Sequence, residues 1–197
     1  MASGPVELVN LALSILGASP IQSLDEASAE AVCARAQYDP ARRAALRSYN
    51  WAFALKRAHL VRVDESVPGS YRYTYQLPAD CLRPVRLIVP SSCGRPFSAY
   101  PVAGFEPAGN RRILCDLEDP VMEYVADVTD TTLFDDLFVQ SFAYRLAAAL
   151  AAPVAGNANL AQALMGNARQ LEREAAAQSG RERRDPATVN IYVEARM

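Results

Sequence analysis

The chain has 197 residues, of which 51% are hydrophobic and 21% charged, and its 20 basic and 22 acidic side chains leave a net charge of −2. This composition is typical of a globular protein, and the small net charge argues against non-specific DNA binding over the whole surface. No apolar run approaches the length of a membrane span, and residues 1–10 lack a secretory signal pattern. We therefore expect neither a membrane span nor secretion.

The sequence offers few residues for catalysis or metal binding. Its four cysteines form no C-x-x-C pair, and His59 is the only histidine. There is no G-x-S-x-G motif and no glycine-rich phosphate loop. We therefore expect reduced thiols at Cys33, Cys81, Cys93 and Cys115, no metal, no cofactor and no catalytic centre.

The first part of the chain has the pattern of two helices. Apolar residues recur at helical spacing over residues 5–17, with Pro5 suited to a first turn and Gly17 to a C-terminal cap. A second helical stretch is predicted over residues 27–49. Pro40 lies inside it and predicts a kink or break near Asp39, which could cap the second piece.

After Trp51 the chain becomes rich in β-branched and aromatic residues. In the segment YRYTYQLP, Tyr71, Tyr73, Tyr75 and Leu77 alternate on one face, as in a strand. Consecutive short strands of this kind usually form antiparallel hairpins. The predicted strands cover residues 71–78, 83–89, 111–115 and 121–128.

Helical periodicity returns at Thr132, and Pro153 is predicted to end that helix before a last one over residues 159–178. We expect an α+β fold in which a four-helix bundle is interrupted by an antiparallel β insertion and followed by an extended C-terminal arm. The predicted bundle comprises residues 1–53 and 130–178, the insertion residues 54–129 and the arm residues 179–197.

The predicted arm joins a charged linker to a strand-prone segment. Such an arm could add a strand to the sheet of another chain. Two alternatives stay open, namely that it folds back on its own β insertion or that it is a frayed end. The residues assigned to partner binding are Arg181, Arg183, Arg184, Val189, Ile191, Tyr192 and Val193.

Two segments carry opposite charge. Residues 35–62 hold seven basic side chains and one acidic one, while residues 116–136 hold eight carboxylates and no Lys or Arg. The basic segment could contact nucleic acid, the carboxylates or His59 could serve a small hydrolase, and both could be solvated faces. A further interpretation is a head-to-tail interface between subunits, in which Arg35, Arg42, Arg43 and Arg47 of one meet Asp127, Asp130, Asp135 and Asp136 of the next.

A series of longer segments is more specific. In order, these are NLALSILGASPIQSLDEASAEA, YDPARRAALRSYNWAFALKRAHL, YRYTYQLPADCLRPVRL and YVADVTDTTLFDDLFVQSFAYRLAAALA. Together they resemble the head-to-tail adaptor proteins of short-tailed bacteriophages and prophages, the tail tubular protein A (gatekeeper-like) family, over residues 6–175. The segments NWAFA, YQLPADCLR and FAYRLAAALA carry the resemblance most clearly.

This resemblance implies a structural protein of the virion that is not an enzyme. Its relatives form a ring, commonly a dodecamer, between the portal protein and the tail nozzle, and packaged DNA passes through the lumen without sequence-specific binding. It also implies location in the tail at the portal vertex, host cytoplasm during assembly, no membrane partner, and a C-terminal segment that docks on a neighbouring ring component. The residues of the shared segments are then packing residues, among them Trp51, Phe53, Leu77, Pro78 and Leu146.

Overall fold

The computed structural model describes residues 4–63, 71–89, 98–100, 105–108 and 111–182. The chain divides into two compact units. One is a helical unit formed by residues 1–54 and 127–182, and the other is a β unit formed by residues 55–126. The predicted α+β class is confirmed, because helices and antiparallel sheets occur together.

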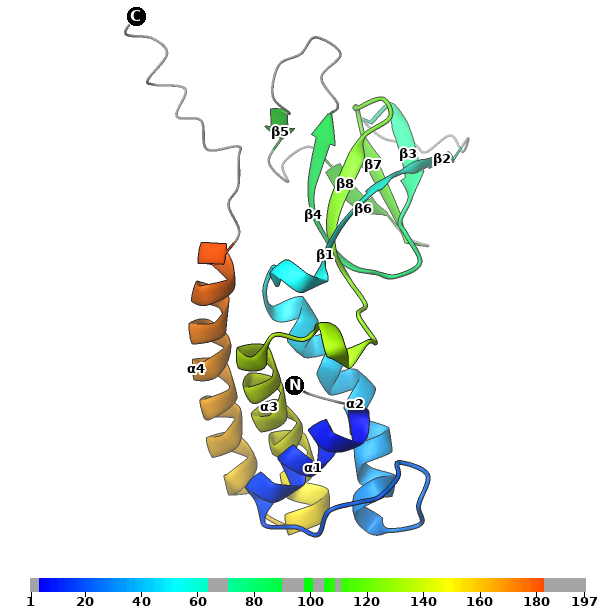
Figure 1. Ribbon diagram of the computed structural model, residues 1–197. Helices are drawn as coiled ribbons and strands as arrows, with labels where there is room; N and C mark the ends of the chain where they lie inside the picture. Colours follow the sequence, from blue (N-terminus) through cyan, green and yellow to red (C-terminus); the bar gives the residue numbers. More distant parts are fainter. Residues whose placement is uncertain (1–3, 64–70, 90–97, 101–104, 109–110, 183–197) are drawn as a thin grey trace, which may run out of the picture. The chain divides into compact units, whose positions relative to one another are not determined.

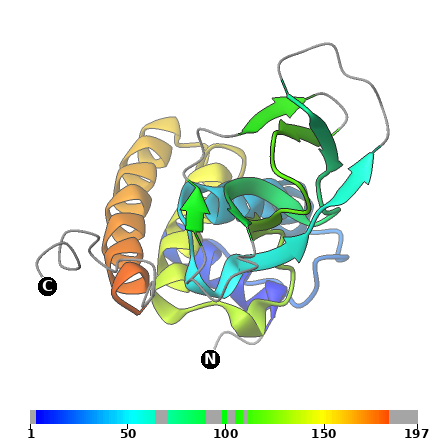
Figure 2. The ribbon, with the colours of Figure 1, turned by 90° about the horizontal axis from the view of Figure 1, so that it is seen from above.

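Four helices make up most of the helical unit (Figure 1; Figure 2 shows the ribbon from above). They are α1 (Pro5–Leu16), α2 (Ala29–Ser48), α3 (Asp136–Ala155) and α4 (Ala158–Glu182), with the short 3-10 turns η1 (Ala52–Ala54) and η3 (Thr131–Leu133). The cap predicted for the first helix is confirmed. Gly17 adopts φ 68° and its N–H donates to the Ser14 carbonyl over 3.1 Å, a left-handed conformation that glycine adopts at little cost.

The two predicted proline breaks are wrong. Pro40 lies inside a continuous α2, and Asp39 accepts hydrogen bonds from Arg42 instead of capping a new helix. A proline inside a helix costs about 3 kcal/mol, and burial of Tyr38 and Leu46 on either side of Pro40 offsets that cost. Pro153 likewise lies within α3, which ends at Gly156 with φ 63°.

Helix α3 is the centre of the helical unit, because it packs against α1, α2 and α4. Its fully buried side chains include Phe138, Phe142 and Leu146. Among the helices that the structure describes, α3 is long and apolar enough to cross a membrane by length and composition alone. Half of that stretch, 50%, is buried inside the protein, as in the core helix of a globular protein, so the length and composition are weak evidence for a span.

An aromatic cluster joins α3 to the segment that follows α2. The ring of Phe138 lies 5.0 Å from those of Trp51, Phe53 and Phe134, measured between centroids. The indole N–H of Trp51 donates to the Ala45 carbonyl over 3.0 Å, so the polar atom of this buried ring is satisfied. The cluster therefore fixes the end of α2 on α3.

Tyr38 packs edge-on against Phe142 with 5.6 Å between ring centroids, and its buried hydroxyl has no hydrogen-bond partner. Burial raises the pKa of Tyr38 to about 12. We expect Tyr38→Phe to raise the free energy of unfolding by up to about 1 kcal/mol, because it removes an unsatisfied buried polar group. Since the folded pKa lies above the ordinary value of 10.0, the parent protein loses stability as the pH rises from 10 toward 12, where Tyr38 ionises in the unfolded chain before it ionises in the folded one.

Urea unfolding of both proteins at neutral and alkaline pH tests this expectation. The advantage of Tyr38→Phe should grow between pH 10 and about 12. A variant less stable than the parent at neutral pH would show that the hydroxyl contributes a favourable interaction in the folded state.

The β unit contains two antiparallel four-stranded sheets. The first has the strand order β1-β8-β4-β5 and the second the order β2-β3-β7-β6. Residues of both sheets, among them Tyr75, Ile113, Leu87 and Met122, form one hydrophobic cluster. The strands are β1 (Leu55–His59), β2 (Val61–Val63), β3 (Tyr73–Gln76), β4 (Cys81–Val89), β5 (Ser98–Tyr100), β6 (Phe105–Ala108), β7 (Arg112–Cys115) and β8 (Val121–Ala126).

The predicted antiparallel pairing is confirmed, but the four predicted strands do not form hairpins with one another in sequence order, because β3 pairs with β7 and β4 with β8. Strands β2 and β3, β4 and β5, and β6 and β7 pair as neighbours in sequence. The last strand, β8, instead lies between β1 and β4, with Leu55 opposite Val125. The first and last strands of the β unit are therefore hydrogen-bonded to each other.

The predicted end of the helical part also needs correction. Helix α4 continues through Glu182, so Arg181 and the other residues of 179–182 belong to a helix and not to an extended arm. Ser179 Oγ accepts a hydrogen bond from the Ala52 N–H over 3.0 Å, which ties this last stretch to η1. The remaining arm residues, Arg183, Arg184, Val189, Ile191, Tyr192 and Val193, lie outside the described residues.

Candidate interaction surfaces

Arg42 is the centre of a buried ion-pair cluster in the helical unit. Its side chain is 4% exposed and contacts the carboxylates of Asp39 and Asp127. It also donates to the Val128 carbonyl over 2.6 Å. Arg43, on the same helix, reaches the second oxygen of Asp127 at 3.2 Å. The cluster joins α2 to the segment that returns from the β unit.

This cluster corrects the predicted intersubunit faces. Arg42 is buried and cannot belong to an exposed basic face, and Asp127 is bound by two arginines of its own chain. The basic and acidic segments therefore meet within one chain at these residues. The sequence showed the complementary charges but not that they pair within one chain, because the partners lie 85 residues apart.

The other predicted face residues are on the surface. Arg35 lies 3.8 Å from Asp25, with both side chains exposed, and Arg47 is exposed near the end of α2. Asp130 and Asp135 act as N-caps: Asp130 accepts from Thr132 N–H and Asp135 from the N–H groups of Leu137 and Phe138. Both carboxylates therefore lie at the start of a helix or 3-10 turn, where they satisfy backbone N–H groups.

In the β unit the acidic segment is again paired internally. Glu123, whose side chain is 4% exposed, binds Arg86 at 2.7 Å and Arg57 at 3.0 Å. These carboxylate–guanidinium pairs hold the strands β1, β8 and β4 side by side. Glu123 therefore does not belong to a solvated acidic face, which was one of the alternatives for residues 116–136.

A second polar cluster in the β unit joins Lys56, Asp80 and Tyr124. The ammonium group lies 2.8 Å from the carboxylate, and the Tyr124 hydroxyl donates to it over 2.9 Å. Burial and the hydrogen bond to Asp80 raise the pKa of Tyr124 to about 12. For Asp80, burial opposes ionisation, but the hydrogen bonds from Lys56 and Tyr124 outweigh it and the pKa falls below 3.8.

This depressed pKa gives a prediction for acid stability. The contribution of ionised Asp80 is fully present above about pH 4 and is lost as the pH falls through its folded pKa. We expect Asp80→Asn to reduce the stability of the β unit at neutral pH by no more than about 1 kcal/mol, because the site is partly exposed. The difference from the parent should shrink below pH 3.8, which urea unfolding followed by tyrosine fluorescence would show. A difference that grows in acid would contradict the assignment.

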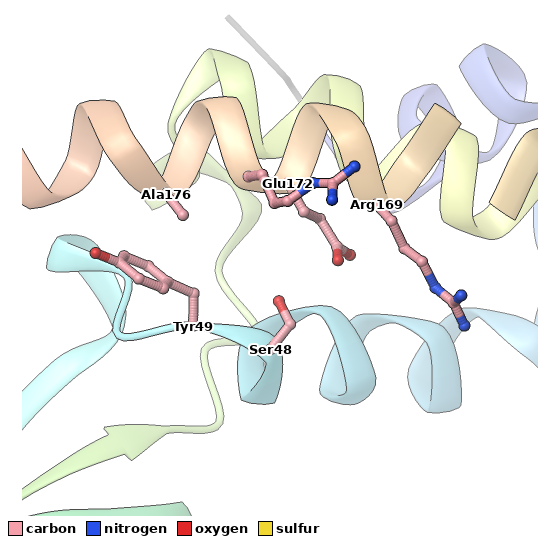
Figure 3. Close-up of a pocket in the computed structure, with 6 residues that line it drawn as sticks. Ser48, Tyr49, Arg169, Glu172 and Ala176 are labelled. Atoms are coloured by element: carbon pink, nitrogen blue, oxygen red, sulfur yellow. The ribbon is translucent and has the colours of Figure 1, made fainter. Parts of the chain in front are cut away.

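The structure places a groove between the end of α2 and α4. It has a volume of about 310 Å³ (Figure 3), and we call it the α2–α4 groove. Arg169 and Glu172 extend from α4 toward α2, and Tyr49 lies on the facing side. The lining residues are Ser48, Tyr49, Arg169, Glu172, Arg173 and Ala176.

The groove carries more positive than negative charge. Glu172 is held by Arg145 of α3, with nitrogen–oxygen distances of 2.6 and 2.7 Å. Arg169 and Arg173 form no hydrogen bond or ion pair with any part of the chain that the structure describes. The groove therefore keeps a positive charge beside the apolar surfaces of Tyr49 and Ala176. The sequence analysis missed it, because its walls come from residues far apart in the chain.

The start of α3 carries an exposed surface of opposite character. Leu133 is 55% and Leu137 38% exposed, although both are large apolar side chains. Three exposed carboxylates lie near them in the sequence, and no Lys or Arg occurs between Arg112 and Arg145. We call this surface the acidic patch; it comprises Asp130, Leu133, Asp135, Asp136 and Leu137. Apolar side chains surrounded by charge are typical of protein contact surfaces.

The residues considered for chemistry belong to different helices and strands. His59 ends the strand β1, with its side chain exposed. Cys81 and Cys115 are buried in the β unit, Cys33 is half-buried in α2, and Cys93 lies outside the described residues. Burial raises the pKa of Cys115, which favours an unreactive thiol. Within the described part of the chain, no three His, Cys, Asp or Glu side chains are grouped as metal ligands would be.

Comparison with known proteins does not assign a family. No model of a protein family matches the chain, and no curated protein matches it.

Proposed function

We propose that this chain is a head-to-tail adaptor of a short-tailed phage virion, one subunit of a ring between the portal protein and the tail nozzle. The proposal rests on the resemblance described above. It includes a four-helix bundle interrupted by a β insertion, a self-assembled ring, most simply a dodecamer, and a C-terminal arm that docks on a neighbouring component. In this role the protein works in the virion at the portal vertex, after assembly in the host cytoplasm.

One structural observation supports this proposal above the others. The helical unit is built from two chain segments that flank a contiguous β unit, in the order in which the resembling segments occur. The most telling segments coincide with packed regions. NWAFA contains Trp51 of the aromatic cluster, FAYRLAAALA lies in the central helix α3, and YQLPADCLR contains the buried Tyr75.

The charge distribution is compatible with a role in assembly. An adaptor holds large rings together through repeated contacts, so a modest contact becomes strong once the ring is closed. The internal ion pairs at Arg42 and Glu123 stabilise each unit, and the α2–α4 groove and the acidic patch supply exposed charge for contacts with other proteins. Carboxylates facing a lumen would repel the phosphates of passing DNA.

The direct test is to mix the purified protein with its cognate portal and to image the product by electron microscopy. We expect added ring density on the tail-facing end of the portal. A truncation after Glu182, which keeps α4 whole, should lose this density if residues 183–197 form the docking arm. Density that persists without these residues would keep the adaptor and reject the arm, whereas no association of either protein would reject the adaptor.

A further inference from the structure

The α2–α4 groove carries a charge that the described chain does not neutralise. Glu172 is already paired with Arg145, while Arg169 and Arg173 reach into the groove with no partner among the residues described. Tyr49 and Ala176 add an apolar wall. An occupant that fits this surface brings carboxylates together with an apolar side chain.

The acidic patch has this chemistry. Asp136 is exposed in the first turn of α3 and makes no hydrogen bond or ion pair with the described residues. Leu137 follows it in α3, Leu133 lies in the preceding turn η3, and these two side chains are 38% and 55% exposed. Figure 1 draws α4 and the turn that holds Leu133 on opposite sides of α3, and no contact joins the patch carboxylates to Arg169 or Arg173 of the same chain. The patch is therefore available to another molecule.

We propose that the acidic patch of one copy binds the α2–α4 groove of the next copy. The carboxylate of Asp136 then pairs with Arg169 or Arg173, and a leucine of the patch packs against Tyr49 and Ala176. Because unlike surfaces meet, the contact is heterologous and repeats from copy to copy, closing into a ring when the rotation permits. This inference rests on the proposed function, which supplies the ring of subunits, and it names the two surfaces that would join them.

Two other occupants fit less well. Residues 183–197 contain three arginines and two carboxylates, so this segment has the same sign of charge as the groove. Nucleic acid would bring phosphates for Arg169 and Arg173 but no aliphatic side chain to pack against the apolar wall of Tyr49 and Ala176. A second copy offers both the carboxylates that would neutralise Arg169 and Arg173 and the apolar side chains that would pack against Tyr49 and Ala176.

Because the chain has a single lysine, chemical cross-linking can test this contact directly. Lys56 is the only lysine in the chain. The Arg173→Lys variant keeps the charge of the groove and introduces one further amine. A carbodiimide couples an amine to a carboxylate in contact with it, and mass spectrometry of a mixture of heavy- and normal-isotope protein distinguishes coupling between chains from coupling within one. Lys56 and Asp80, 2.8 Å apart in one chain, serve as the internal control for the reaction.

We expect an isotopically mixed product that joins position 173 to a carboxylate of the acidic patch. Its yield should fall about tenfold when Asp136→Arg is added, and it should recover when Arg169→Glu restores the opposite charges. Glu118→Arg, an exposed charge reversal in the β unit, should leave the yield unchanged.

Formation of the Lys56–Asp80 product without the intermolecular one would overturn the proposal. So would coupling of position 173 to carboxylates elsewhere in the chain. A fluorescent DNA duplex that binds the parent but not an Arg169→Glu, Arg173→Glu variant, with no intermolecular product, would assign the groove to nucleic acid instead. None of these measurements contains the portal, so failure of this contact is distinguishable from failure of the adaptor role.

Discussion

Replacing Phe138 by alanine is expected to lower the free energy of unfolding of the helical unit by about 4 kcal/mol, the range found for truncation of a fully buried phenylalanine. The side chain is 0% exposed and contacts Trp51, Phe53, Phe134 and Phe142. Its loss would leave a cavity that rigid ring neighbours fill poorly. No other side chain of the described cluster contacts as many aromatic rings.

Trp51 is the only tryptophan, and it lies within the cluster, so its fluorescence reports the unfolding of the helical unit. Urea unfolding should be followed by this signal and by circular dichroism, because Phe138→Ala also alters the surroundings of the indole. Phe138→Leu should lower the free energy of unfolding by no more than about 1.5 kcal/mol. Leu133→Ala, at an exposed site, should change it by no more than about 0.5 kcal/mol. A loss below about 1 kcal/mol for Phe138→Ala would show that the ring does not pack as described.

Removing the Asp127 carboxylate is expected to cost about 3 kcal/mol, because Asp127→Ala leaves the guanidinium of Arg42 buried with a weaker set of partners. Arg42 would keep the exposed carboxylate of Asp39 and the Val128 carbonyl. The matched control is Arg43→Ala. Arg43 also binds Asp127 but is 54% exposed, so its loss should cost less than about 1 kcal/mol.

The double variant Arg42→Met, Asp127→Ala separates burial of a charge from the loss of an attraction. If most of the cost arises from an uncompensated buried guanidinium, the double variant should be more stable than Asp127→Ala alone. Equal or lower stability of the double variant would show instead that the ion pair itself stabilises the junction of α2 and the returning segment.

The helices were the most predictable part of the chain. The apolar spacing before Gly17 and the capping carboxylate Asp135 are local signals, and both correspond to what the structure shows. The proline rules failed at Pro40 and Pro153, because a local preference of about 3 kcal/mol competes with burial of several side chains of the same helix. Such burial depends on partners elsewhere in the chain.

The pairing of the charged segments could not be predicted from the sequence. Their complementarity was visible in the sequence, but not whether Arg42 meets Asp127 of its own chain or of another. The α2–α4 groove could not be found at all, since Tyr49 and Arg169 become neighbours only after α4 packs in the helical unit. Among the strand pairings, that of β8 with β1 was the hardest to predict from the sequence, because it joins the two ends of the β unit.

That pairing bears on how the helical unit can fold at all. Closing a flexible loop costs entropy that rises with the logarithm of its length. With Leu55 held opposite Val125, the folded β unit acts on the helices as a short two-stranded stem, and the closure cost falls by roughly 2 to 3 kcal/mol relative to an unfolded insertion of the same length. The docking of α2 on α3 would then proceed fastest after the β unit has formed. Lengthening the turns of the β unit that lie away from the β1–β8 pair would change this order of folding little.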